Sequence, residues 1–292
     1  MQPFSKERTS YINIKSPRFK YEIPCIYFNP LKITSHTVAF IFVGGKAMTF
    51  SYVKHINNSF FDNHYLISFE GSEYGHNKNK TSRSVKSFLN EIDTIVNFVR
   101  AKFPTLKIFL LGESLGAAMS MVYYAKYMNK VNGLYCWNMA MRMVDPNKKT
   151  FGQALSLYAK VLLTILTNIP THCYKNSNII TKVSSNQDLI KVATSLNKKL
   201  VTNSREYIAF FFANKFAWKW FFKHLNDDSI KFIYFQSEED YFISHKMLKC
   251  ILNKSHNSKH FVYLEKGYHN LAQEWQINDN LYEIIERDIK SS

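Results

Sequence analysis

The segment KIFLLGESLGAA, residues 107–118, limits the folds open to this chain more than any other stretch. Its apolar run predicts a buried strand, and the small and apolar residues after it predict a helix that continues to about residue 130. A Gly-x-Ser-x-Gly motif centred on Ser114 joins the two, which is the setting of a nucleophile elbow, a sharp turn that lifts a serine above a sheet. Gly112 and Gly116 supply the small neighbours that so tight a turn needs. The alternative is a strand end bounded by glycines whose serine only caps the helix.

Strands and helices alternate along most of the chain. Two short β-rich segments, 9–15 and 21–28, predict an antiparallel pair. Apolar runs predict further strands at 37–43, 65–69, 133–139, 230–236 and 259–264. Apolar periodicity predicts helices at 49–58, 82–103, 245–253 and 271–290. Continuous apolar strands that alternate with helices are typical of an α/β fold, so we expect a mostly parallel, eight-stranded sheet with helices on both faces.

The alternation is interrupted once, near Asp145-Pro146, and resumes only with the last two strands. The stretch between them has helix patterns, including one at 154–169, and few strand signals. We therefore expect a core domain of residues 1–144 and 228–292 that is interrupted by a helical cap at 145–227.

The chain carries a formal net charge of +16. Such a charge attracts anionic partners, here a membrane surface or an acidic protein. The basic residues are scattered and form no recognisable nucleic-acid module, so we do not expect nucleic acid as a partner. Lys, Asn, Ile, Phe and Tyr are all abundant and share A/T-rich codons, so a biased genome composition is an alternative source of the charge.

The four cysteines, Cys25, Cys136, Cys173 and Cys250, have no CxxC or zinc-type spacing. They predict free, largely buried thiols in a reducing compartment and no metal site. The N-terminal residues lack the apolar region of a signal peptide, and no uncharged apolar run is long enough to cross a membrane. We expect a cytoplasmic protein that uses no metal or organic cofactor.

A serine nucleophile needs a general base, which in a sheet of this kind comes from a loop at the carboxyl end of a later strand. His269 fits this role because it follows the strand 259–264 in the sequence GYHN, where Gly267 permits a sharp turn. The alternative is a solvated loop histidine. Four other histidines are expected at the surface: His76, His245, His256 and His260.

The base in turn needs a carboxylate to orient it. The strand 230–236 is followed by SEEDYFI, in which Asp240 precedes an apolar trio that can bury against the sheet. Glu238 and Glu239 compete with Asp240 for this role, and Asp145 is a remote alternative. With Asp240, the order along the chain is serine, aspartate, histidine, as the order of the strands dictates.

The negative charge that develops on a carbonyl oxygen under attack needs N–H donors. The backbone N–H of Leu115, directly after the nucleophile, is one candidate. The second is expected from the loop at 44–47, which follows the strand 37–43, and either Gly45 or Lys46 supplies the N–H. A plain turn is the alternative for this loop.

Together these residues resemble the α/β-hydrolase superfamily, and within it the branch of monoacylglycerol lipases and lysophospholipases, also called the serine aminopeptidase-like group. The resemblance covers about residues 37–139 and 228–290. It is carried by the segments FVGG (42–45), GESLG (112–116), SEED (237–240) and GYH (267–269). In that family the corresponding positions are the oxyanion loop, the nucleophile, the acid and the base, and an insertion after the sixth strand forms a helical cap. This chain departs from the family at Val43-Gly44, where the family usually has His-Gly.

The last part of the insertion, residues 207–225, predicts a helix rich in aromatic residues. Its expected core face consists of Tyr207, Phe210, Phe211, Trp218, Phe221, Phe222 and Leu225. The opposite side carries Phe212, Phe216 and Trp220, flanked by Lys215, Lys219 and Lys223. Aromatic residues beside cations suit a lipid interface, but the three are also candidates for lining an acyl-chain pocket or for core packing.

The resemblance and the order of the triad imply a serine hydrolase that cleaves carboxylic esters of apolar acyl chains, with Ser114, Asp240 and His269 as its catalytic residues. An alternative is an esterase or thioesterase for acyl chains carried by an acidic acyl carrier protein, which the positive charge would dock. Peptidase chemistry uses the same triad, and a non-catalytic binding protein of this fold is a further alternative.

Overall fold

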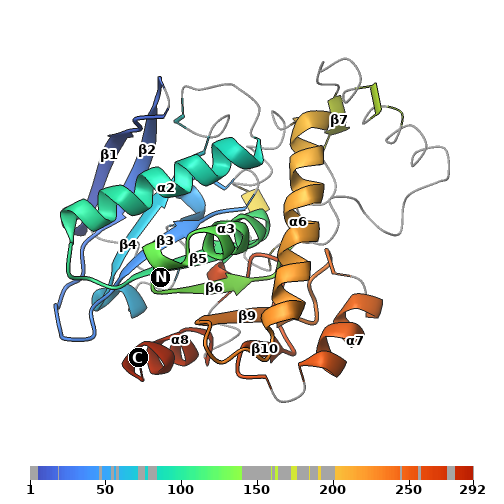
Figure 1. Cartoon of the computed structure of the whole chain (residues 1–292). Coiled ribbons are helices and arrows are strands. Elements are labelled where there is room, and N and C mark those ends of the chain that lie inside the picture. Colours follow the sequence, from blue (N-terminus) through green and yellow to red (C-terminus); the bar gives the residue numbers. More distant parts are fainter. Residues whose placement is uncertain are drawn as a thin grey trace.

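The eight strands of the computed structural model form one sheet with the order β1-β2-β4-β3-β5-β6-β9-β10 (Figure 1). Their bounds are Thr9–Lys15, Glu22–Phe28, Tyr65–Phe69, Ala39–Val43, Ile108–Glu113, Gly133–Trp137, Phe232–Ser237 and Phe261–Leu264, in that spatial order. The pairs β1–β2 and β2–β4 are antiparallel and the other five are parallel, which confirms the expected sheet. The structure describes residues 6–18, 20–45, 48–53, 56, 59–71, 76–77, 84–139, 159, 162–163, 172–175, 184, 190–191, 201–243, 245–255, 258–274 and 280–291.

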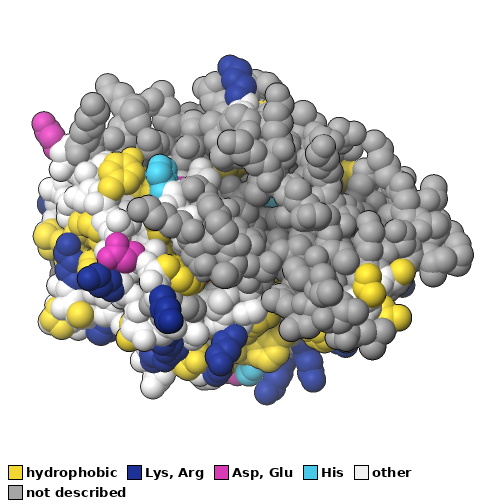
Figure 2. All heavy atoms as spheres, turned by 90° about the horizontal axis from the view of Figure 1, so that it is seen from above, with side chains coloured by type: hydrophobic (Ala, Val, Ile, Leu, Met, Phe, Trp, Pro, Cys, Tyr) yellow, Lys and Arg dark blue, Asp and Glu magenta, His cyan; other side chains and the backbone are white. Residues whose placement is uncertain are grey.

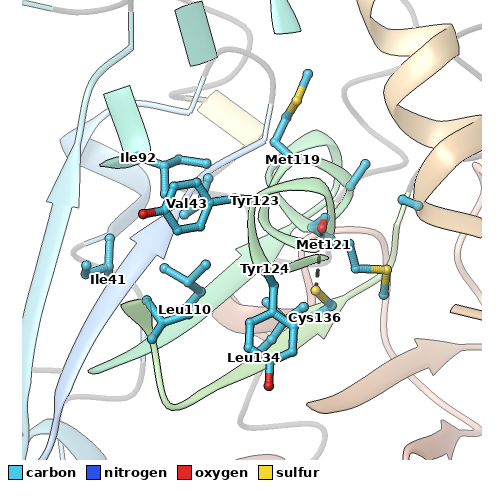
Figure 3. Packing of buried hydrophobic residues seen from close by; sticks show 14 of the residues in the cluster. Ile41, Val43, Ile92, Leu110, Met119, Met121, Tyr123, Tyr124, Leu134 and Cys136 are labelled. Carbon is cyan, nitrogen blue, oxygen red and sulfur yellow. Dashed lines mark hydrogen bonds between the residues drawn. The ribbon is translucent and has the colours of Figure 1, made fainter. Parts of the chain in front are cut away.

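Alternate residues of the central strands enter two cores, one on each face of the sheet. In β3, Ile41 and Val43 join one cluster, whereas Phe40 and Phe42 join the other. The first face is covered by α2 (Val85–Lys102), α3 (Leu115–Lys126), α6 (Ser204–His224) and α7 (His245–Lys254), and the second by α1 (Phe50–Val53) and α8 (Asn280–Lys290). Figure 3 shows the first core, in which the side chains of α3 meet those of the strands beneath it. Burial on both faces explains why the central strands are apolar throughout.

Two helices differ from their expected bounds, one at its start and one at its end. The helix expected at 82–103 begins at Val85, because the Ser84 side chain accepts a bond from the Ser87 N–H at 3.0 Å and caps it. Helix α3 ends at Lys126, and a separate 3₁₀ turn covers Met128–Lys130.

Two other expected helices are only partly described. The helix expected at 49–58 is described as α1, Phe50–Val53, and most of its second half lies outside the described residues. The helix expected at 271–290 consists of a 3₁₀ turn, Leu271–Gln273, and then α8, and residues 275–279 lie outside the described residues.

The insertion contains a feature that the sequence did not predict, a small antiparallel pair of β7 (His172–Lys175) and β8 (Val201–Asn203) (Figure 1). The helix expected at 154–169 lies mostly outside the described residues, of which 159 and 162–163 are helical. A helical cap at 145–227 therefore stays a prediction.

In helix α6, two side chains do not lie on the side where they were expected. Phe211 was expected in the core but is 55 % exposed, whereas Trp220 was expected on the opposite side but is 7 % exposed and packs between Tyr124 and Phe232. The core face is centred on Ala213 and Ala217, because α6 packs directly on α3 and small side chains permit that approach. The expected core face was based on the large aromatic residues, and it placed Phe211 and Trp220 on the wrong sides of the helix.

One histidine expected at the surface is buried. The ring of His260 is 3 % exposed, stacks on Phe232 at 4.4 Å, and has nitrogens 2.7 and 3.1 Å from the backbone oxygens of Phe232 and Asp227. His76 is exposed, as expected, and the side chains of His245 and His256 lie outside the described residues.

The described thiols agree with the expectation of free cysteines. Cys25 and Cys136 are buried and Cys250 is half-buried, while the side chain of Cys173 lies outside the described residues. Burial raises the pKa of the Cys25 and Cys136 thiols. Within the described ranges no helix has the length and apolarity of a membrane span.

Candidate active site

Ser114 stands at the turn between β5 and α3 with φ 58° and ψ −120°. Such a conformation costs a residue with a side chain of order 1–3 kcal/mol, so its surroundings must hold it in place. The Ser114 N–H donates to the backbone oxygen of Trp137 at 3.1 Å, and the backbone oxygen of Ser114 accepts from the Ala117 N–H at 3.1 Å. These bonds fix the turn to β6 on one side and to α3 on the other.

The glycines of the motif are required by close packing, as the sequence predicted. A Cβ on Gly116 would lie 1.8 Å from the backbone oxygen of Val43, and one on Gly112 would lie 2.7 Å from the Ala117 Cα. Gly45 approaches Ser114 itself, since a Cβ there would lie 2.8 Å from the Ser114 Cβ. The loop after β3 therefore passes directly beside Ser114.

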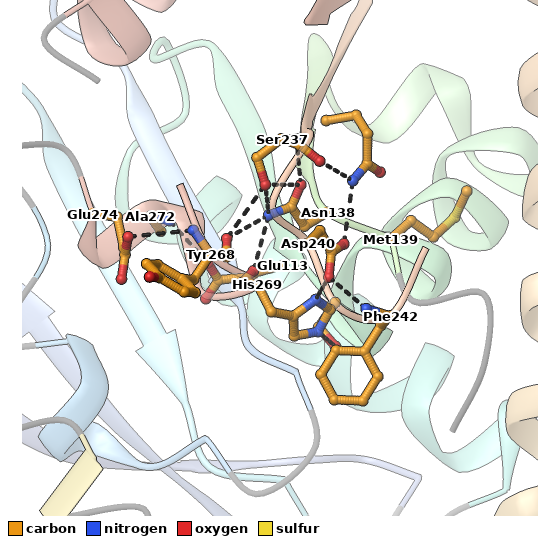
Figure 4. Close-up of polar contacts among 12 residues, drawn as sticks. Glu113, Asn138, Met139, Ser237, Asp240, Phe242, Tyr268, His269, Ala272 and Glu274 are labelled. Carbon is orange, nitrogen blue, oxygen red and sulfur yellow. Dashed lines mark hydrogen bonds and ion pairs between the residues drawn. The ribbon is translucent and has the colours of Figure 1, made fainter. Parts of the chain in front are cut away.

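The structure brings together the three residues predicted as a catalytic triad. The Ser114 Oγ lies 2.7 Å from the His269 Nε2, and the His269 Nδ1 lies 2.8 Å from an Asp240 carboxylate oxygen. His269 and Asp240 are buried and Ser114 is partly exposed. Figure 4 shows the His269 ring between Asp240 and the Phe242 ring, whose centroid is 4.3 Å away.

Asp240 is held in place by two further donors. Its Oδ1 accepts from the Phe242 N–H at 2.9 Å, and its Oδ2 accepts from the Gln236 side-chain nitrogen at 3.2 Å. Asp240, rather than Glu238 or Glu239, is thus the carboxylate within hydrogen-bond distance of His269.

The two competing carboxylates make other contacts. Glu238 accepts from the Tyr263 hydroxyl, and a Glu239 oxygen accepts from the N–H of Gly267 at 3.0 Å. Gly267 has φ 112°, which only glycine adopts without strain, so the sharp turn before the histidine is as predicted. Asp145 lies outside the described residues.

The two expected oxyanion donors are described in part. Leu115 is buried and begins α3, so its N–H belongs to the first turn of a helix and has no partner within that helix. The Gly45 N–H lies 3.1 Å from the Met48 sulfur, which is a weak acceptor and leaves the N–H suited to a stronger one. Lys46 lies outside the described residues. The assignment of the second donor stays a prediction.

The three residues predicted to bind substrate are not brought together on one surface. Phe212 and Phe216 are 59 % and 47 % exposed, whereas Trp220 packs inside the core. Contact of any of them with a substrate stays a prediction.

Sequence reasoning missed three buried polar residues around the triad: Glu113, Asn138 and Gln236. A Glu113 oxygen accepts from the N–H of Ala272, three residues beyond His269, at 2.8 Å. Burial raises the pKa of Glu113 to about 7, although that bond lowers it. Each of the three lies at the end of an apolar strand, and a polar residue at that position is the signal that points to them.

The arrangement supports one type of chemistry. An imidazole between a serine hydroxyl and a buried carboxylate can accept the hydroxyl proton, while the carboxylate stabilises the imidazolium that forms. A positive helix end directly after the serine favours negative charge at the reacting atom. Within the described ranges no cluster of His, Cys, Asp or Glu side chains is suited to hold a metal ion.

Comparison with known proteins agrees with the fold. The profile of the family described as "Serine aminopeptidase, S33" matches residues 41–276. A soluble variant of the monoglyceride lipase of Saccharomyces cerevisiae, in complex with a substrate analogue, is similar with a TM-score of 0.72 at 12 % identity, over 100 % of this chain and 99 % of that one. The monoacylglycerol lipase of Paleococcus ferrophilus gives 0.66 at 19 % identity, over 93 % and 100 %. A thermostable carboxyl esterase of Bacillus coagulans gives 0.66 at 14 % identity, over 97 % and 98 %. A search of curated protein sequences found no match.

Proposed function

Since the chain belongs to the serine aminopeptidase S33 family of α/β-hydrolases, we propose that it is a serine hydrolase that cleaves carboxylic esters of apolar acyl chains. The observation that carries the proposal is the continuous set of hydrogen bonds from Asp240 through His269 to Ser114. The likeness to monoacylglycerol lipases and a carboxyl esterase supports the choice of an ester substrate.

The reaction proceeds through an acyl-enzyme. His269 Nε2 takes the proton of Ser114 as its Oγ attacks the ester carbonyl carbon, and the oxyanion accepts bonds from the N–H of Leu115 and of Gly45 or Lys46. His269 then gives the proton to the departing alkoxide, which leaves as the alcohol. In the second half, His269 takes a proton from water, the hydroxide attacks the acyl carbon, and Ser114 departs with the proton returned from His269. Asp240 holds the N–H of His269 at Nδ1 throughout.

A series of p-nitrophenyl esters with acyl chains of two to twelve carbons tests the substrate class. We expect turnover of the esters, with kcat/KM rising with chain length as more apolar surface is buried, by up to about 15-fold for each added methylene pair. An amino-acid arylamide and an acyl thioester are the comparison substrates. Cleavage of the arylamide without turnover of any ester would contradict the proposal and favour a peptidase.

The exposed side of α6 supports the idea that the protein reaches its substrate at a lipid surface. Phe211, Phe212 and Phe216 are all about half exposed on successive turns, and the exposed lysines Lys215 and Lys219 lie beside them. Exposed aromatic residues next to cations suit the boundary between lipid headgroups and acyl chains. Figure 2 shows that lysine and arginine side chains lie beside hydrophobic ones along one edge of the described surface. We propose that this face of α6 contacts an anionic lipid surface.

Flotation with vesicles that contain anionic phosphatidylglycerol tests this contact. The double variant Phe212→Ser, Phe216→Ser is expected to bind at least tenfold more weakly, because two half-exposed aromatic rings lose their burial in lipid. Leu31→Ser with Ile33→Ser is the matched control, since both residues are 68 % exposed and lie outside α6. Turnover of a short, water-soluble ester should be unchanged in both double variants.

Three outcomes would contradict the lipid contact. They are equal binding to neutral and anionic vesicles, equal loss in the control variant, and binding of wild-type protein to an acidic acyl carrier protein in place of vesicles. The last outcome, if salt-sensitive, would favour the alternative in which the positive charge docks a carrier protein.

A further inference from the structure

The residue that follows β6, Asn138, is fully buried and has a left-handed backbone conformation with φ 41°. Asparagine is among the few residues with a side chain that adopt this conformation readily. A buried amide in such a position needs partners for its oxygen and its nitrogen, because an unpaired buried polar group costs about 1–3 kcal/mol.

The Asn138 side chain finds its partners in two segments that are distant in sequence. Its Oδ1 accepts from the Ser237 N–H at 2.9 Å, and its Nδ2 donates to the backbone oxygens of Tyr268 at 2.7 Å and His269 at 3.2 Å. A backbone N–H only donates and a backbone oxygen only accepts, so these partners fix the orientation of the amide. Figure 4 shows the bonds converging on Asn138.

The partners of this side chain belong to the segments that carry the acid and the base. Ser237 is the last residue of β9 and lies three positions before Asp240, while the two carbonyls belong to the base and to the residue before it. The neighbouring Trp137 accepts the bond from the Ser114 N–H. The end of β6 is thus hydrogen-bonded to all three segments of the triad.

We propose that Asn138 is a positioning residue that sets His269 and Asp240 against Ser114. This inference rests on the proposed function. A general base must be held to within about 0.5 Å of its working position, and the Asn138 amide bonds the end of β6 directly to the loop that carries His269. Without it, the carbonyls of Tyr268 and His269 lose a donor, and the turn that carries the imidazole gains freedom.

Two substitutions separate the side chain from the backbone conformation. Asn138→Gly keeps the left-handed backbone and removes the amide, and we expect kcat for a soluble ester to fall about 10- to 100-fold with KM changed less than threefold. Asn138→Asp keeps an oxygen for the Ser237 N–H but turns a second oxygen toward two carbonyls, and we expect a larger fall that deepens as pH rises and the new carboxyl loses its proton.

Asn132→Gly is the matched control, since Asn132 lies at the other end of β6 and its side-chain oxygen accepts from the Ile108 N–H at 2.8 Å. We expect its kcat to stay within about twofold of wild type. All variants are assayed at least 15 °C below their own Tm, and Asn138→Ser replaces Asn138→Gly if the latter does not fold. A kcat equal to wild type, or an equal loss in the control, overturns the inference. Full activity of Ser114→Ala, by contrast, overturns the proposed function and is measured separately.

Discussion

Ester hydrolysis by the Ser114→Ala variant is expected to fall by roughly 10⁴- to 10⁶-fold, because the proposed nucleophile and its covalent intermediate are lost together. The remaining rate would come from the oxyanion donors and from substrate binding, which do not need the hydroxyl. KM for the residual reaction should change little, since the Ser114 Oγ contributes its bonds to the reaction rather than to binding. The measurement is kcat and KM for a p-nitrophenyl ester under conditions in which wild type turns over.

Ser120→Ala is the matched control for that loss. Ser120 lies six residues further along α3 and is fully buried, and its hydroxyl has no hydrogen-bond partner among the described residues. Removing this hydroxyl leaves no described partner unsatisfied, so activity should stay within about twofold of wild type and stability should not fall. Full activity of Ser114→Ala, or an equal loss in Ser120→Ala, would rule out Ser114 as the nucleophile.

The second large effect is expected for Asp240→Asn, with kcat reduced by about 10⁴-fold near neutral pH. Asp240 accepts bonds from His269, the Phe242 N–H and the Gln236 amide. An asparagine that turns its nitrogen toward His269 would favour the tautomer with the proton on Nε2, which cannot accept the Ser114 proton. It would also leave the imidazolium without a buried counter-charge.

Glu239→Gln is the control for this substitution, since Glu239 belongs to the same loop and its carboxylate accepts from the N–H of Gly267 and not from His269. We expect a loss of less than about fivefold, because a neutral amide oxygen can still accept that bond. The pH dependence of kcat/KM, recorded for both variants, completes the comparison. A greater loss in the Glu239 variant than in the Asp240 variant would contradict the assignment of the acid.

Residues tied to a strand end by a local pattern could be predicted from the sequence. The elbow around Ser114 is recognisable because its glycines lie at fixed distances from the serine, and the packing at Gly116 shows why no other residue fits. His269 and Asp240 follow from the order of the strands, since the carboxyl ends of parallel strands meet at one edge of a sheet. The sheet itself follows from the alternation of apolar strands with amphipathic helices.

Residues whose role depends on contacts between distant segments could not be predicted. The Asn138 side chain forms hydrogen bonds with Ser237, 99 positions away in the sequence, and with His269, 131 positions away. No spacing pattern within one segment predicts a contact between residues so far apart. The phase of α6 was misassigned at Phe211 and Trp220 because an aromatic helix offers apolar residues on every side, and only the approach of α3 decides which are buried. His260 shows the same limitation, since its burial depends on carbonyls of β9 and of the turn before it.

The most direct test of the triad is covalent labelling with a fluorophosphonate, which reacts with a serine only when a base activates it. Wild-type protein is treated with the probe, digested, and the labelled peptide identified by mass spectrometry, with Ser114→Ala and Asp240→Asn treated in parallel. We predict a single modified site at Ser114, no labelling of the Ser114 variant, and labelling of the Asp240 variant slowed by at least about 100-fold. Absence of label from folded wild-type protein, or a label on any other serine, would contradict the assignment of Ser114, His269 and Asp240 as a catalytic triad.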